Sequence, residues 1–140
     1  MSSVKSNYLA WIQKAENDFL NIKNNTAVQD VPWDTVCFHA QQAAEKLLKG
    51  FLIYHAQPLV RTHDLVAWLA ICAAIDSSLS SLQNDCRRLS YYAVAVRYPD
   101  EVCEPDESDG RGRHSGSRCH CGPSVVTRGC CRRIRTRGWQ

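Results

Sequence analysis

The sequence predicts an all-α protein, an up-and-down antiparallel four-helix bundle formed by residues 1–104. In four separate segments of this part, apolar residues recur at the three- and four-residue steps of an amphipathic helix. Short polar or proline-containing stretches separate these segments, and short connections favour antiparallel neighbours. At 140 residues, the chain is long enough for one domain with a hydrophobic core and too short for two.

The segment from Trp33 to about His55 is expected to be the central helix of the bundle. Its apolar positions follow helical spacing: Val36, Ala40, Ala43, Ala44, Leu47, Phe51 and Tyr54. The alanines in the middle would let a neighbouring helix approach towards the short end of the usual spacing of ~8–10 Å. The opposite side, expected to face solvent, carries Gln42, Glu45, Lys46 and Lys49.

Three further helices are expected around this one. The first covers about residues 5–24, where Trp11, Ala15 and Ile22 lie on one face. The third begins after Thr62, a residue suited to capping a helix, and contains Leu65, Trp68, Leu69 and Cys72. The fourth contains Leu82, Cys86, Leu89, Ala93 and Val96, and is expected to end before Pro99 because the residue preceding a proline avoids the helical conformation.

Three stretches in this order, residues 37–52 (CFHAQQAAEKLLKGFL), 61–65 (RTHDL) and 96–100 (VRYPD), resemble the HEPN family. The resemblance covers about residues 4–104. It implies a small helical protein, often encoded beside a nucleotidyltransferase, and a helical fold with a further closing helix. It also implies a homodimer that acts as a nucleotide- or RNA-associated accessory protein, paired with a nucleotidyltransferase in a toxin–antitoxin or defence system. The alternatives are a metal-independent ribonuclease of the same family and a purely structural dimeric interaction module.

Residues 105–140 differ from the rest and do not resemble the family. They hold eight arginines and three acids, a net charge of +5, whereas residues 1–104 hold nine basic and eleven acidic residues, a net charge of −2. With few apolar residues, this arginine- and cysteine-rich tail cannot bury a helical face and is expected to be disordered or translated out of frame. One out-of-frame back-translation of residues 113–121 encodes an alanine-rich, helix-forming segment, so the closing fifth helix is expected to be missing.

Cysteines and hydropathy set the expected compartment and exclude several classes of site. No run of about 18 apolar residues and no signal peptide occurs, so a cytoplasmic protein without membrane contact is expected. Cys37 and Cys72 fall on apolar helical faces and are expected to be free core thiols. In the tail, Cys119 and Cys121 are separated by one residue and Cys130 directly precedes Cys131, whereas structural zinc sites normally place two to four residues between paired cysteines. We therefore expect no metal and no cofactor.

The sequence lacks the ribonuclease motif of the resembling family, an Arg followed after four to six residues by a His. Arg97 is followed at those distances by Val102, Cys103 and Glu104. Because RNA cleavage by 2′-hydroxyl attack needs a group that exchanges protons near neutral pH, the missing His weighs against an enzyme. An active site would need a His from elsewhere, such as His63.

A set of polar residues could still converge on a phosphate-bearing ligand. It comprises His39, Lys46, His63, Asp64, Arg97 and Tyr98. An arginine can donate two parallel hydrogen bonds to a phosphate, a tyrosine can stack on a base, and the free amides at the start of a helix favour an anion. In the structural alternative, His63 and Asp64 only begin a helix, Arg97 pairs with Asp100 or Glu101 on the surface, and His39 belongs to the core.

Overall fold

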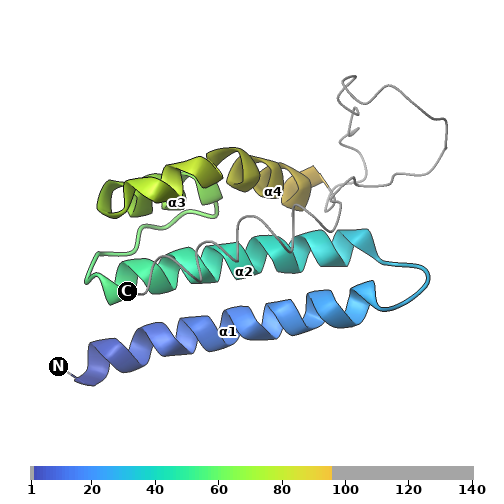
Figure 1. The fold of residues 1–140 in the computed structure, drawn as a ribbon, viewed down its shortest axis with the longest axis horizontal. Helices are drawn as coiled ribbons and strands as arrows, with labels where there is room; N and C mark the ends of the chain where they lie inside the picture. The colour runs from blue at the N-terminus through green and yellow to red at the C-terminus, as the bar shows by residue number, and fades with distance from the viewer. Residues whose placement is uncertain (1, 96–140) are drawn as a thin grey trace.

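The computed structural model describes residues 2–95, and this part of the chain is an all-α bundle without a strand (Figure 1). Its elements are α1 (Ser2–Thr26), α2 (Trp33–Tyr54), α3 (Leu65–Ile75), the 3-10 helix η1 (Ser77–Leu82) and α4 (Gln83–Ala95). The expected all-α bundle with four α-helices is confirmed. Within the described residues, no helix is long and apolar enough to cross a membrane.

Helices α1 and α2 form a long antiparallel hairpin (Figure 1). At one end of the hairpin, the rings of Tyr8 and Tyr54 lie 5.1 Å apart between centroids. Further along, Asp18 of α1 contacts Lys46 of α2. Residue numbers therefore rise along α1 while those of the contacting residues fall along α2, as in an antiparallel pair. Helix α2 also contacts α3 and α4, which confirms it as the central helix.

Helix α2 ends in a left-handed turn at a residue that is not glycine. The amide of Gln57 donates to the Leu52 carbonyl at 2.8 Å, and the amide of Ala56 donates to the Ile53 carbonyl at 3.0 Å. These two bonds form a Schellman motif, in which the residue after the C-cap adopts the left-handed conformation. Here that residue is Ala56, with φ 54°, although glycine is usually preferred because it has no Cβ.

The connector 55–64 runs back along the bundle, so α3 starts beside the middle of α2 (Figure 1). The His63 carbonyl lies 3.4 Å from Nε2 of Gln41, and further along α3 the Cys72 thiol donates to the Leu48 carbonyl. Helix α3 therefore advances in the same direction as α2. This connection departs from a strict up-and-down order, which residue periodicity could not reveal because it does not report the direction of a helix.

The hydrophobic core lies between the helices, and its largest fully buried side chains are Trp68 and Phe51. The predicted apolar stripe of α2 is buried up to Phe51, whereas Tyr54 at the end of the helix is exposed. Cys37 and Cys72 are both buried. Cys72 is a free thiol as expected, but Cys37 is disulfide-bonded, so the prediction of a free thiol was wrong for Cys37.

Several predictions concern residues outside the described range. They include the end of the fourth helix before Pro99, the ligand-binding roles of Arg97 and Tyr98, and the absence of a closing fifth helix. The division into a domain of residues 1–104 and a tail of residues 105–140 also stays a prediction.

Candidate ligand-binding site

A buried carboxylate of α1 holds two of the predicted site residues. Asp18 is only 5% exposed, and its Oδ1 lies 2.8 Å from Nδ1 of His39 while its Oδ2 accepts a hydrogen bond from Nζ of Lys46 at 2.5 Å. His39 and Lys46 are seven residues apart, so both lie on the side of α2 that faces α1. We call Asp18, His39 and Lys46 the Asp18 cluster. It joins α1 to α2 through polar groups beside an apolar core.

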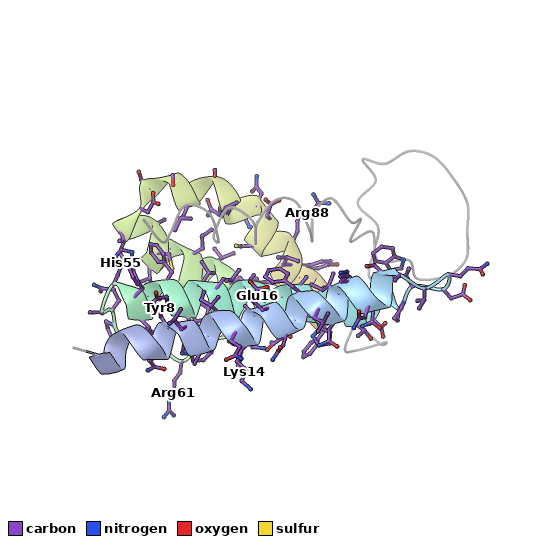
Figure 2. All side chains as sticks on the ribbon, turned by 60° about the horizontal axis from the view of Figure 1, so that its bottom comes forward. Tyr8, Lys14, Glu16, His55, Arg61 and Arg88 are labelled. Carbon is purple, nitrogen blue, oxygen red and sulfur yellow. The ribbon has the colours of Figure 1, made fainter. Side chains whose placement is uncertain are left out.

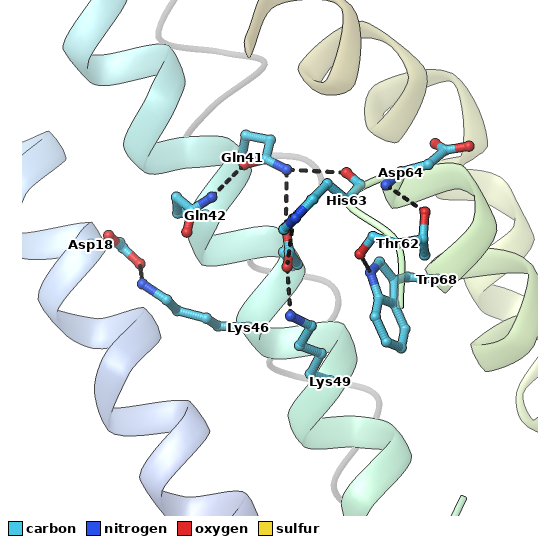
Figure 3. A network of polar contacts seen from close by, with 10 residues as sticks. Asp18, Gln41, Gln42, Lys46, Lys49, Thr62, His63, Asp64 and Trp68 are labelled. Atoms are coloured by element: carbon cyan, nitrogen blue, oxygen red, sulfur yellow. Dashed lines mark hydrogen bonds and ion pairs between the residues drawn. The ribbon is translucent and has the colours of Figure 1, made fainter. Parts of the chain in front are cut away.

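A second buried carboxylate lies on α2 itself, where Glu45 is 5% exposed. Figure 3 shows Gln41, Lys49 and His63 gathered at this part of α2. Oε1 of Glu45 accepts a hydrogen bond from Nζ of Lys49 at 2.6 Å, and its Oε2 accepts one from Nε2 of Gln41 at 3.2 Å. Nδ1 of His63 approaches Oε1 of Glu45 to 3.7 Å. Glu45, Gln41, Lys49 and His63 form what we call the Glu45 cluster. The expectation that Glu45 faces solvent was wrong, because the connector before α3 covers this side of α2.

Lys49 connects the Glu45 cluster to two aromatic side chains. Its Nζ lies 5.2 Å from the ring centroid of Trp11 on α1 and 5.3 Å from that of Trp68 on α3. Both distances fall within the range of a cation–π interaction, about 6 Å. Nε1 of Trp68 in turn donates to the Thr62 carbonyl at 3.0 Å. Lys49 therefore links three helices, which makes a structural role the best account of this side chain.

The start of α3 is already occupied by groups of the protein. The N-cap is Asp64, whose Oδ1 accepts from the Val66 amide at 2.9 Å, and the Leu65 amide donates to Oγ of Ser90 on α4 at 3.3 Å. Thr62, which we expected to be the cap, accepts from the Asp64 amide instead. These amides are thus not available to an anion, and the Asp64 carboxylate would repel one.

His63 remains the predicted residue most open to a ligand. Its side chain is 94% exposed, although the carboxylate beside its Nδ1 is buried. The structure brings His63 close to Glu45 and places it next to Asp64, whereas His39 and Lys46 belong to the separate Asp18 cluster. Arg97 and Tyr98 lie outside the described residues.

The sequence contained a signal for the burial of Asp18 and Glu45, which we had not predicted. Asp18 lies at helical spacing between the buried residues Ala15 and Ile22, and it therefore belongs to the core face of α1. Gln41, Glu45 and Lys49 follow each other at four-residue steps on α2. A buried charge needs a partner, and Gln41 and Lys49 at helical spacing from Glu45 could have been recognised as its partners.

The described residues also include a core thiol, and they contain no cluster of metal-ligating side chains. Burial, reinforced by neighbouring Cys86, raises the pKa of the Cys72 thiol to about 12, so it stays protonated and unreactive near neutral pH. No group of three or more His, Cys, Asp or Glu side chains in residues 2–95 is arranged to hold a metal ion. The exposed imidazole of His63 is open to a ligand.

Comparison with known proteins places the chain in a family. No curated protein and no solved structure matches it. A family model described as the HEPN domain matches residues 8–111, well over half of the chain, and spans α2, α3 and α4 and most of α1. The match includes all three stretches on which the resemblance rested. The chain therefore belongs to the HEPN domain family.

Proposed function

We propose that this protein is a HEPN-domain accessory protein that binds a nucleotide or RNA through a phosphate group at the start of α3. The phosphate contacts His63 and Arg97, and Tyr98 stacks on the base. Asp64 lies next to His63 at this site, whereas His39 and Lys46 contact the buried Asp18 and are not part of it. The observation that carries the proposal is the exposed imidazole of His63, which lies against the buried Glu45 carboxylate.

The position of α4 supports a contribution from Arg97. Ser90 of α4 accepts a hydrogen bond from the Leu65 amide, so the second half of α4 passes the start of α3. Helix α4 is described to Ala95, two residues before Arg97. Since Asp64 and Glu45 are both negative, a phosphate at this place needs a strong cation, and a guanidinium group supplies it in a bidentate geometry.

Replacing Arg97 tests the site. Arg97→Lys keeps the charge and loses the planar fork, so the affinity for ATP or a short RNA should fall by about 1–3 kcal/mol. Isothermal titration calorimetry with ATP measures this change. The matched control is Arg61→Lys, because Arg61 is exposed and points away from the Arg88 side of the bundle in Figure 2. Unchanged affinity in Arg97→Lys, or an equal loss in both variants, would place the ligand elsewhere.

The runner-up function is a metal-independent ribonuclease. The contact of His63 with Glu45 favours it, since a carboxylate beside Nδ1 can orient an imidazole while Nε2 faces a substrate. Repeated turnover of RNA by the purified protein, abolished by His63→Ala in a variant that keeps its helicity, would establish this function. Binding without turnover supports the accessory protein.

We further propose that the chain forms a homodimer, acts in the cytoplasm and pairs with a nucleotidyltransferase in a toxin–antitoxin or defence system. Membership of the HEPN family supports this proposal. Light scattering of the purified chain tests the dimer. Co-purification with the product of an adjacent nucleotidyltransferase gene tests the partner, and we expect the two proteins to form a stable complex. A monomer would contradict the proposed dimer and the structural dimeric module alike, and the lack of any such complex would contradict the pairing with a nucleotidyltransferase.

A further inference from the structure

The outer face of α4 presents two adjacent arginines and a tyrosine to solvent. Asn84, Arg87, Arg88 and Tyr91 are all exposed and follow each other at three- and four-residue steps, so they lie within an arc of about 100° around the helix. Cys86 and Leu89 on the opposite side are buried in the core. We call Arg87, Arg88 and Tyr91 the α4 face.

The arginines of the α4 face are not used by the fold. Within the described residues, neither Arg87 nor Arg88 takes part in an ion pair or a side-chain hydrogen bond, whereas Lys46 and Lys49 of α2 are paired with buried carboxylates. Asp85, the acidic residue of α4, lies on the flank of this face and is half-buried. Figure 2 shows Arg88 pointing away from α1 and α2. The face therefore carries positive charge that is open to a ligand.

The α4 face borders the start of α3. Ser90 follows Arg87 by three residues and directly precedes Tyr91, and its Oγ accepts the hydrogen bond of the Leu65 amide. The exposed imidazole of His63 is two residues away from Leu65. Tyr91 is 53% exposed, so its side chain reaches the surface of this face. Positive charge and an aromatic surface thus adjoin the place where the phosphate site is proposed.

We propose that the α4 face binds a single-stranded RNA, whose phosphates contact Arg87 and Arg88 while a base stacks on Tyr91. This inference rests on the proposed function and names its ligand as an RNA strand rather than a mononucleotide. Ala95 lies two residues before Arg97, the proposed phosphate ligand. From Arg87 to Ala95 the helix rises by about 12 Å at 1.5 Å per residue, so a single phosphate at the proposed site cannot also contact Arg87. Guanidinium groups on the backbone and an aromatic ring under a base are the usual contacts of proteins with single strands.

The test compares two double variants that remove the same charge. Arg87→Gln with Arg88→Gln alters the α4 face, and Lys14→Gln with Lys23→Gln removes two exposed lysines from α1. Glutamine has a helix propensity close to that of arginine and lysine, so both variants should fold. Fluorescence anisotropy with a labelled 12-nucleotide single-stranded RNA gives the affinity at several salt concentrations. Calorimetry with ATP gives the affinity for a mononucleotide.

We expect the α4 variant to bind the RNA at least tenfold more weakly and to bind ATP as the wild type does. The slope of log K against log salt concentration should become shallower by about 1.4, since each phosphate contact with a single strand contributes about 0.7. The α1 variant should change neither the slope nor the ATP affinity. Tyr91→Ala should weaken RNA binding about fivefold or more, and Tyr91→Phe should restore it because the ring still stacks.

The outcomes separate this inference from the proposed phosphate site. If ATP binding depends on Arg97 while the α4 variant binds RNA as tightly as the wild type, the RNA face is refuted and the phosphate site stands. If the α4 variant loses RNA binding while Arg97→Lys changes nothing, the RNA face stands and the phosphate site fails. A wild-type protein that binds no RNA, or equal losses in the α4 and α1 variants, overturns the inference.

Discussion

The Asp18 cluster offers a direct test of how α1 is held on α2. Asp18→Asn keeps the shape of the side chain and removes the negative charge that His39 and Lys46 contact at 2.8 and 2.5 Å. Breaking a fully buried pair by removing one partner costs about 3–5 kcal/mol, because it leaves a charge buried without a partner. Here the side chains of His39 and Lys46 are 20% and 23% exposed and can turn towards water. We therefore expect the free energy of unfolding to fall by about 1–3 kcal/mol.

Urea-induced unfolding, followed by circular dichroism at a helical wavelength, measures this change. The control is Asp30→Asn, because Asp30 is exposed in the loop between α1 and α2. A double-mutant cycle with Lys46→Gln isolates the interaction of Asp18 with Lys46, and we expect a coupling energy of about 1 kcal/mol. A loss of less than about 0.5 kcal/mol in Asp18→Asn, the usual effect of a surface substitution, would refute the reasoning.

Three further predictions concern stability. Ala56→Gly should raise the free energy of unfolding by about 0.5–1 kcal/mol because glycine adopts φ 54° without strain, whereas Ala70→Gly inside α3 should lower it by about 1 kcal/mol; urea unfolding decides both signs. Trp68→Phe removes the hydrogen bond to the Thr62 carbonyl and should cost about 1–3 kcal/mol in the same assay, and no loss would show that the bond is unimportant. Because burial raises the pKa of Cys72 to about 12, the folded protein holds the thiol proton more tightly than the unfolded chain does. This contribution to the free energy of unfolding should be fully present below about pH 9 and be lost towards pH 12, by up to about 1.4 kcal/mol per pH unit. Thermal melts should show a shallower loss in Cys72→Ala, and equal slopes would contradict this.

The helices of this protein were largely predictable from local patterns in its sequence. Apolar spacing placed the central helix at residues 33–55, and the structure has it at Trp33–Tyr54, because one side of a helix must be buried for it to be stable in water. The HEPN resemblance also rested on short stretches, and the family model confirmed it. The chain's local sequence therefore determined its fold class and its family.

The tertiary structure decided the direction of α3, which polar residues are buried and which groups they contact. Periodicity predicted that Glu45 lies on the solvent side of α2. The connector 55–64 instead returns over that side and buries the carboxylate with Gln41, Lys49 and His63. Likewise, only the packing of α1 against α2 brought Asp18 to His39 and Lys46, which are 21 and 28 residues away in sequence. Helical spacing places Asp18 on the core face of α1 and brings Gln41 and Lys49 beside Glu45 on α2. Which groups of another segment contact these carboxylates depends on the packing of distant segments, and spacing within one segment carries no information about that packing.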